Sequence, residues 1–372
     1  MEYRKRRTWA EISLDNLIDN YRLLARLAAP ARVMAVLKAN AYGHGAIPVA
    51  SALEREGCVH FAVATLEEAT ELRESGSCAQ ILVLGAADDP VYVRTAARMD
   101  ITLPVFDARH AGELASKAGG IPLKVQWKVD TGLGRYGYTL REGTTETAVN
   151  QAQQIAATPG IFLTGVWTHM ACANMPQQDE YTAHQLALFD KLVRGIRAAG
   201  LDVKFHCANS PTVLRFPDAH YDFVRPGNAL YGFVPYSDIP FKPVLALKSH
   251  ILYIHQLQTG DSLSYGRLFT AQRPTKVAII PFGYADGIQR CASNRMQALV
   301  HGIQVPSIGK FCMDCTALDI TDVPQAAVGD TVTIVGTEGG RTLRVEDITG
   351  LYPGSGPELT TVLGMRIPRF YV

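Results

Sequence analysis

The sequence predicts a two-domain α/β protein, with an N-terminal (β/α)8 TIM barrel over residues 10–240 and a mainly antiparallel β domain over residues 241–372. Between residues 30 and 235, short apolar runs alternate with amphipathic stretches in about eight strand–helix units, which fits a closed parallel barrel better than an open sheet. After a proline-rich join at Val234–Pro243, strands are separated by glycine and aspartate turns. Residues 1–9 are expected to pack with the second domain.

The barrel strands are predicted at the apolar runs Arg32–Asn40, His60–Thr65, Ala79–Ala86, Ile101–Phe106, Pro122–Asp130, Ile161–His169, Asp202–Ser210 and Tyr221–Gly232. The helical stretches between them include Ala46–Glu56, Leu66–Ser75, Ala108–Ala118, Thr145–Thr158 and Tyr181–Gly200, and the last has the clearest helical spacing. The second domain has predicted strands within Val244–Leu257, Thr275–Gly287, Met296–Gly309 and Gly329–Gly336, and a helix near Asp347.

Composition excludes several classes of protein. Lys and Arg number 36 against 35 Asp and Glu, so no overall field favours nucleic acid or an acidic membrane, and the basic cluster Tyr3–Arg7 is interpreted as a solvated terminal segment. The chain has no apolar run of membrane-spanning length and no apolar signal core, so we expect a cytoplasmic protein with no membrane or nucleic-acid partner.

The seven cysteines are expected to be reduced thiols rather than a disulfide framework. Cys312 and Cys315 have the spacing of half a zinc site but lack the second pair of ligands. We interpret them as packing thiols and predict no metal.

Polar residues collect at the carboxyl ends of the predicted barrel strands, which is where the chemistry of this fold lies. These residues are Lys38, Lys128 with Asp130 and Arg135, His169, His206 with Asn209 and Ser210, and Arg225 with Gly227. So many polar functions on one rim indicate a site.

Lys38 ends an apolar strand, where an amine can form an imine with a carbonyl substrate or with pyridoxal phosphate. The loop containing Gly227 lies where barrels often hold phosphate, and Ser210 opens a helix nearby. A lysine beside a phosphate cradle favours pyridoxal phosphate over an aldolase-type imine, although both remain open at this point.

One motif in the chain is misleading. Gly132–Gly137 satisfies G-x-G-x-x-G, but Tyr138–Gly143 intervenes before any helix, and no acidic residue occurs between Glu146 and Asp179. A dinucleotide site requires both features, so we do not predict one.

Nine motifs, in order and over nearly the whole chain, resemble alanine racemase: AVLKANAYGHG, KVDTGLGRYG, THMACAN, HCANSP, VRPGNALYG, LSYGR, GYADG, FCMD and RIPRFY. Members of that family are pyridoxal-phosphate-dependent homodimers with shared active sites and the domain layout described above. The resemblance implies that the protein interconverts L- and D-alanine, supplying D-alanine for peptidoglycan.

The resemblance also implies two catalytic residues. Lys38 would form the imine with the cofactor and act as acid and base on one face of the substrate. Tyr265, which comes from the partner subunit in the family, would be the base on the opposite face. Inverting a stereocentre by proton transfer needs such a pair.

The remaining roles implied by the resemblance concern the cofactor and the substrate. Residues matching contacts to the cofactor are Tyr42, Ser210, Gly227 and Asn228 at the phosphate, Arg225 at the pyridine nitrogen with His206 behind it, and His169 near the ring. Residues matching contacts to the substrate carboxylate are Arg135 and the Met313 amide, with supporting residues Lys128 (often carbamylated in the family, and then paired with Arg135), Asp314 and Tyr284.

Arg225 favours racemisation over rival reactions. A guanidinium cannot accept a proton, so the pyridine nitrogen should stay unprotonated and the carbanion should be short-lived. A barrel-fold pyridoxal-phosphate decarboxylase would be expected to place a carboxylate there. A non-enzymatic, single-barrel cofactor carrier would need neither Tyr265 nor a second domain.

The sequence departs from the family at Met365, where many members have a tyrosine that reaches the phosphate. The pocket wall there is apolar and flexible. Since an apolar pocket rejects an added hydroxyl poorly, a broader serine and alanine racemase is the alternative.

Overall fold

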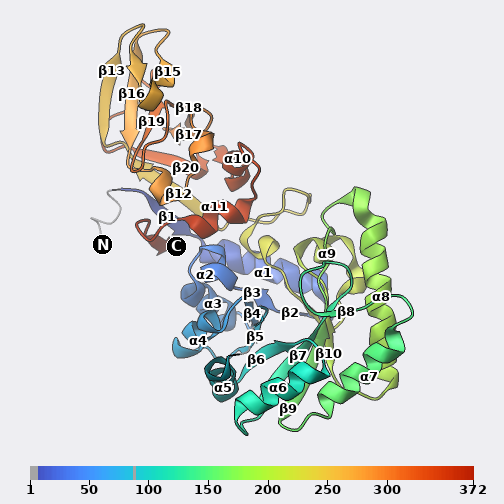
Figure 1. Ribbon diagram of the computed structural model, residues 1–372. Coiled ribbons are helices and arrows are strands. Elements are labelled where there is room, and N and C mark those ends of the chain that lie inside the picture. The colour runs from blue at the N-terminus through green and yellow to red at the C-terminus, as the bar shows by residue number, and fades with distance from the viewer. Residues whose placement is uncertain (1–6, 87–88) are drawn as a thin grey trace.

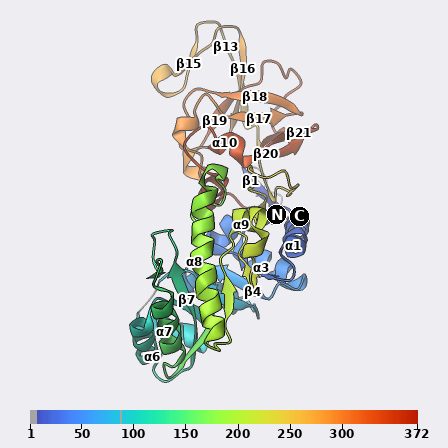
Figure 2. The same cartoon turned by 90° about the vertical axis from the view of Figure 1, so that its right-hand side faces the viewer.

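The computed structural model describes residues 7–86 and 89–372 of the chain. Two lobes lie end to end, with the barrel at the lower right of Figure 1 and the C-terminal domain at the upper left. The side view in Figure 2 places the C-terminal domain above the barrel, with α8 (Asp179–Ala198) running along the barrel wall. The predicted fold class is confirmed.

The barrel is built from parallel strands around a closed ring. In spatial order, the strands are β2 (Arg32–Val33) with its continuation β3 (Ala35–Val36), β4 (His60–Val63), β5 (Gln80–Val83), β6 (Ile101–Val105), β7 (Leu123–Asp130), β9 (Ile161–Trp167), β10 (Lys204–His206) and β11 (Phe223–Val224). The Asp222 amide donates to the Phe205 carbonyl, which joins β11 to β10, and Phe223 pairs with Arg32, which joins β11 back to β2. These contacts close the ring.

The helices outside the ring are α1 (Leu14–Ala28), α3 (Ala46–Arg55), α4 (Leu66–Glu74), α5 (Pro90–Arg98), α6 (Ala108–Ala118), α7 (Thr145–Ala156), α8 and α9 (Ser210–Arg215). Their starts follow local rules. Thr65 and Glu68 form a capping box at α4, and Asp89 caps α5, whose first residue is proline. The predicted set did not name α1 or α5, both of which are amphipathic helices.

The C-terminal domain is centred on one sheet, in the order β13 (Tyr253–Leu257), β16 (Thr275–Ile280), β19 (Thr316–Asp319), β18 (Ile303–Ile308), β17 (Gln297–Val300), β20 (Thr331–Glu338), β12 (Leu245–His250), β1 (Trp9–Ile12) and β22 (Arg369–Tyr371), with β21 (Arg341–Leu343) on β20. Apart from the parallel pair β1–β22, these pairs are antiparallel. A separate hairpin, β14 (Ser262–Leu263) and β15 (Phe269–Thr270), and two helices, α10 (Val345–Thr349) and α11 (Gly356–Val362), complete the domain. The helix predicted near Asp347 is α10.

The start of the described chain belongs to this sheet. β1 pairs with β12 and lies across the predicted boundary at residue 10, so residues up to Ile12 extend the C-terminal sheet. Thr8 donates to the Pro281 carbonyl at 3.0 Å. Most of the basic cluster Tyr3–Arg7 lies outside the described residues, and its last member, Arg7, also donates to the Pro281 carbonyl.

All seven cysteines are free. Among the described helices, none has the length and apolar character that crossing a bilayer requires.

Candidate active site

A cavity of about 290 Å³ lies at the carboxyl ends of the barrel strands, and its lining residues all fall between Val36 and Tyr236. Nine residues predicted from the sequence line it: Lys38, Tyr42, Arg135, His169, Asn209, Ser210, Arg225, Gly227 and Asn228. The structure therefore brings together the predicted barrel half of the site.

Lys38 is followed by an unusual turn. The predicted strand Arg32–Asn40 is wrong beyond Val36, because Ala39 to Tyr42 form one left-handed turn with φ between 52° and 55°. Left-handed backbone costs about 1–2 kcal/mol per residue for residues with a Cβ. Neighbouring segments must hold such a turn in place.

Three contacts hold it. The Glu68 carboxylate accepts a hydrogen bond from the Ala39 amide at 2.6 Å, and the Asn40 side-chain oxygen accepts one from the Ala46 amide at 2.6 Å. From the C-terminal domain, Arg369 donates to the Gly43 carbonyl at 3.2 Å. The position of Lys38 is thus fixed from α4, α3 and β22.

Another part of the cavity wall is a cradle of small groups that the Tyr42 side chain contacts. The Ser210 hydroxyl accepts hydrogen bonds from the Gly227 and Ala229 amides, both at 3.1 Å. The Tyr42 ring stacks on Tyr231 with 4.8 Å between centroids, and its hydroxyl lies so close to Gly227 that a Cβ there would be 2.2 Å away. Only glycine leaves room for the tyrosine hydroxyl in this cradle.

Arg225 is buried at the cavity floor and begins a chain of hydrogen bonds. It donates to the Thr168 carbonyl at 2.7 Å and to Nδ1 of His206. Since a guanidinium only donates, His206 Nδ1 must accept, which puts the ring proton on Nε2. His206 Nε2 therefore donates to the Gln126 side-chain oxygen at 2.8 Å.

Trp167 separates Arg225 from a second buried cation. Its ring lies 5.0 Å from the Arg225 guanidinium and 5.0 Å from the Lys128 Nζ. Lys128 is fully buried and donates to the Val129 carbonyl at 2.6 Å, so it lies beside the cavity without lining it.

Burial controls the protonation of this region. It lowers the pKa of Lys128 to about 7, with Arg225 and Arg135 adding to the effect and Asp130 opposing it. Burial, and then Arg135, also lower the pKa of Lys38. The pKa of His169 is depressed by burial and by the surrounding cations, so its imidazole is neutral at pH 7.

The glycine-rich loop delivers Arg135 to the cavity. One Asp130 carboxylate oxygen accepts from the Gly132 and Leu133 amides, and the other accepts from the Gly134 amide at 2.9 Å. The loop then continues into β8 (Tyr138–Thr139) beside β7 and not into a helix, as expected for a segment that is no dinucleotide site.

The cavity fits pyridoxal phosphate in two respects. No carboxylate occurs among its described lining residues, which include Lys38, Arg135 and Arg225, so it suits an anionic cofactor and an anionic substrate. The Tyr236 hydroxyl and Trp167 Nε1 are buried in the lining without a partner among the described residues. Buried polar groups normally have a hydrogen-bond partner, so we expect a polar ligand to bind beside these two groups.

The other predicted site residues lie on the C-terminal domain, outside this cavity. Tyr265 follows β14 and is 66% exposed, and Met313 is 53% exposed. Met365 is fully exposed, while Tyr284 is half-buried under Arg290, whose guanidinium lies 5.3 Å from its ring. Within one chain, these residues do not join the Lys38 group.

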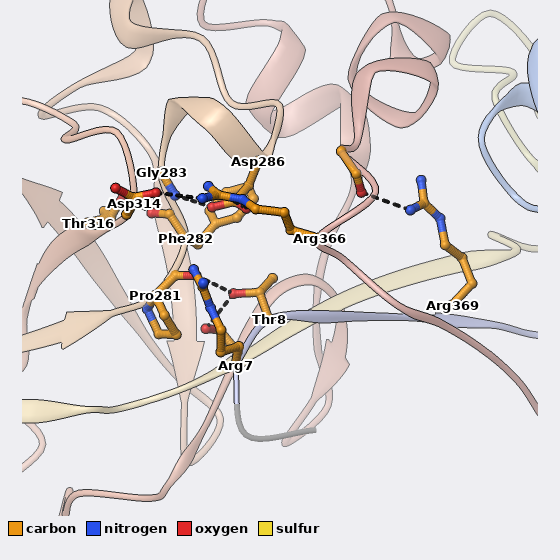
Figure 3. A network of polar contacts seen from close by, with 12 residues as sticks. Arg7, Thr8, Pro281, Phe282, Gly283, Asp286, Asp314, Thr316, Arg366 and Arg369 are labelled. Carbon is orange, nitrogen blue, oxygen red and sulfur yellow. Dashed lines mark hydrogen bonds and ion pairs between the residues drawn. The ribbon is translucent and has the colours of Figure 1, made fainter. Parts of the chain in front are cut away.

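Arg366 organises the loop that carries Met313. Its guanidinium pairs with Asp314 at 2.6 Å and with the buried Asp286 at 3.0 Å, and Figure 3 shows it pointing between the two carboxylates. Asp286 in turn accepts from the Gly283 amide. A Cβ on Gly283 would be 2.4 Å from the Met313 carbonyl, so loop and turn pack closely.

Trp167, Gln126 and Tyr236 are polar residues of this region that were not predicted. Trp167 and Gln126 stand two positions before His169 and Lys128 on their strands, so alternation places each pair on the same face and could have indicated them. Tyr236 lies in the irregular join between the domains, where the sequence carries no such signal.

Two family models match the chain, "Alanine racemase, N-terminal domain" over residues 12–235 and "Alanine racemase, C-terminal domain" over residues 244–371. The chain belongs to the alanine racemase family. It is 39% identical to the alanine racemase of Sorangium cellulosum, over 98% of this chain and 99% of that one, and 37% identical to alanine racemase 2 of Caldanaerobacter subterraneus, over 99% and 95%.

Solved structures agree with this assignment. The alanine racemase of Streptomyces coelicolor covers 100% of both chains with a TM-score of 0.91 and 34% identity. That of Bacillus anthracis, solved with bound L-Ala-P, covers 99% of this chain and 95% of that one with a TM-score of 0.89 and 30% identity. The activity is therefore that of an alanine racemase, an isomerase, and the decarboxylase and carrier alternatives are not favoured.

Proposed function

We propose that this alanine racemase binds pyridoxal phosphate in the barrel cavity and works as a homodimer in which each cavity is completed by Tyr265 of the partner subunit. One observation carries the proposal. Lys38, the Ser210–Gly227 cradle and Arg225 line a single cavity free of described carboxylates, while Tyr265 and Met313 are exposed on the other domain. A second chain can present these exposed residues to the cavity.

The residues that would hold the cofactor follow from the cradle. Ser210, Gly227, Asn228 and Tyr42 would hold its phosphate, Arg225 would face its pyridine nitrogen, and Lys38 would bond to its aldehyde. When bound, pyridoxal phosphate acidifies the Cα proton of an attached amino acid by withdrawing electrons. Because Arg225 cannot accept a proton, it would hold the ring nitrogen as an acceptor only.

Lys38 moves one proton in the proposed reaction. Burial and Arg135 lower its pKa, so its amine can be free to take the Cα proton on its own face of the substrate. The tyrosine from the partner would hold the second proton at its hydroxyl on the other face. The two residues exchange roles when the substrate is the opposite enantiomer.

Substrate orientation falls to Arg135 and the Met313 amide, which would bind the carboxylate. The charge of Arg135 suits a carboxylate, and the pair from Arg366 to Asp314 holds the Met313 loop in place. Carbamylated Lys128 would supply the anion that orients Arg135. Asp314 and Tyr284 would act as supporting residues around this loop.

Mixing two inactive variants tests the shared site. Lys38→Ala and Tyr265→Phe should each lose racemisation as homodimers. After dissociation and reassociation together, half of the dimers are mixed, and one of their two sites has both residues intact, so about one quarter of wild-type activity should return. Two Lys38→Ala preparations mixed in the same way are the control. No recovery in demonstrated mixed dimers would refute the sharing of Tyr265.

Proton NMR with L-alanine in heavy water tests the two-base assignment. Loss of the α-proton signal with appearance of D-alanine is expected for the wild type. A Tyr265→Phe variant that keeps cofactor absorbance should lose formation of the D-isomer. If it racemises at the wild-type rate, the assignment of the second base is wrong.

The physiological role follows from the family. We propose that the enzyme works in the cytoplasm and supplies D-alanine for peptidoglycan. A deletion strain that grows only with added D-alanine would support this role, and normal growth without D-alanine or a second racemase would contradict it.

A further inference from the structure

The interior of the barrel is unusually polar along one line. Barrel interiors of this kind are mostly filled with Val, Ile and Leu. Here Arg225, His206 and Gln126 form a hydrogen-bonded column from the active-site floor toward the amino-terminal ends of the strands. Apolar packing by Phe223 and its neighbours fills the space beside it.

A second cavity, of about 160 Å³, lies at that far end. Its polar lining comes from the starts of the strands and consists of His60 (β4), Gln80 (β5), Thr102 (β6), Lys124 and Gln126 (β7), Thr164 (β9) and Lys204 (β10). Gln126 is thus shared between the column and this cavity. Nothing in the proposed reaction uses the remaining residues.

The charged side chains among the described lining residues of this cavity are both lysines. No carboxylate is among its described lining residues, whereas Lys124 and Lys204 both are. Lys124 pairs with Asp100 at 2.7 Å, but the two side chains are 42% and 64% exposed, and ion pairs that solvent reaches in this way contribute little. Lys204 stands 3.8 Å from Asp222, beyond hydrogen-bond distance. Both ammonium groups can therefore turn to a ligand.

A buried donor also points to a ligand. His60 is only 6% exposed, and its Nε2 is buried without a partner among the described residues. Burial, and then the nearby Arg32, lower its pKa, so the ring is neutral, and Nε2 can donate when the ring proton is on that nitrogen. A buried polar group left unpaired costs about 1–3 kcal/mol, which a suitable acceptor in the cavity would recover.

We propose that the amino-terminal end of the barrel is a binding site for a small tetrahedral oxyanion, inorganic phosphate or sulfate, held by His60, Gln126, Lys124 and Lys204. The cavity has the volume of about five waters at ~30 Å³ each, which accommodates four oxygens around one central atom. The Thr102 hydroxyl adds a neutral donor to the lining, whereas the Thr164 hydroxyl already donates to the Val125 carbonyl at 3.1 Å.

The direction of the hydrogen bonds connects this site to the active site. The Gln126 oxygen accepts from His206, which leaves the Gln126 amide NH2 to donate to the anion. An anion there polarises the Gln126 amide, strengthens its bond to His206 and makes His206 Nδ1 a better acceptor for Arg225. An anion in the far cavity therefore changes the hydrogen bond that Arg225 makes to His206. Because Arg225 faces the cofactor ring in the proposed function, this link rests on the proposed cofactor position.

Calorimetric titration tests the site without reference to activity. Phosphate and sulfate are titrated separately into protein saturated with pyridoxal phosphate, at constant ionic strength, so that the cofactor cradle is filled. Saturable binding is expected for the wild type, and roughly tenfold or more weaker binding for Lys124→Met/Lys204→Met. Lys191→Met, on the exposed face of α8, is the matched control and should bind as the wild type does.

The outcomes separate cleanly. If only phosphate or only sulfate binds, that anion is the ligand of the site, and binding of both supports general recognition of tetrahedral oxyanions. No saturable binding, or binding unchanged in the double variant, overturns the site. A cofactor absorbance that shifts with anion in the wild type but not in the double variant supports the link to Arg225, whereas binding without that shift overturns the link and leaves the site.

Discussion

Replacing Gly227 with alanine tests the proposed phosphate cradle through a single added methyl group. The new Cβ would lie 2.2 Å from the Tyr42 hydroxyl and 2.9 Å from its ring carbon, so the hydroxyl must retreat by about 1.2 Å to reach an ordinary contact of 3.4 Å. The φ of Gly227 is −109°, so the substitution adds no left-handed strain. The substitution therefore acts through steric overlap with Tyr42.

Tyr42 cannot retreat without loss. Its ring stacks on Tyr231, which is fully buried and donates to the Val36 carbonyl at 3.0 Å, and its backbone belongs to the left-handed turn. A hydroxyl displaced by this distance would lose the hydrogen bond that we propose it makes to the phosphate. Hydrogen bonds to charged groups contribute about 1.5–3 kcal/mol, so the Kd for pyridoxal phosphate should rise about 10- to 150-fold.

Titration of the apoprotein with pyridoxal phosphate, followed by absorbance, measures this change. Gly112→Ala is the matched control, because Gly112 lies on α6 with nothing within 4 Å of an added Cβ. That variant should bind the cofactor as the wild type does and gain up to about 1 kcal/mol of helix stability. In a Tyr42→Phe background the hydroxyl is absent, so Gly227→Ala should raise the Kd for pyridoxal phosphate by a smaller factor than it does in the wild type. Equal affinity for the wild type and Gly227→Ala would refute the cradle.

Four further predictions concern other parts of the site and the fold. Since burial lowers the pKa of Lys128 to about 7, its amine is partly free at neutral pH, and 13C-labelled bicarbonate should give one carbamate NMR signal that Lys128→Met abolishes. Arg366→Ala, which frees the Met313 loop, should raise KM for alanine severalfold and leave the Kd for the cofactor unchanged; equal shifts in both would contradict a role at the loop. Met365→Tyr should lower the rate of serine turnover relative to alanine, and an unchanged ratio would exclude Met365 as a determinant of substrate range. Burial lowers the pKa of His44 to about 4. The difference from the unfolded value of about 6.5 contributes about 3 kcal/mol to the free energy of unfolding, which is fully present above pH 6.5 and is lost as the pH falls through 4. Denaturant unfolding across this range should show that loss, with a flatter profile for His44→Gln than for a control at the exposed His184.

The barrel half of the site could be predicted because strand ends are readable from sequence. An apolar run ending in a polar residue identifies both the strand and its carboxyl end, and Arg225, His169 and Ser210 were all placed in this way. Parallel strands then bring those ends together whatever the intervening loops do.

The left-handed turn after Lys38 could not be predicted in the same way. Ala39 and Ala41 have no intrinsic preference for positive φ, although Asn40 tolerates it, and the apolar run before Lys38 predicted a strand that continues to Asn40. The turn depends on Glu68, which is local to another helix, and on Arg369, which is 326 residues away from Gly43. Distant partners of this kind leave no mark in a local pattern.

The C-terminal domain therefore has two separable relations to catalysis. Through Arg369 and α11 it supports the turn behind Lys38 of its own chain: a Cβ on Gly43 would lie 1.9 Å from the Thr360 carbonyl oxygen. Through Tyr265, in the proposed dimer, it supplies the base for the partner's cavity. The first relation needs only one chain and the second needs two, so dissociation should remove the second base while leaving the Lys38 turn and the cofactor cradle intact. In the proposed dimer, that separation accounts for the need for a second domain, even though the described residues that line the cavity come from the barrel and the join after it.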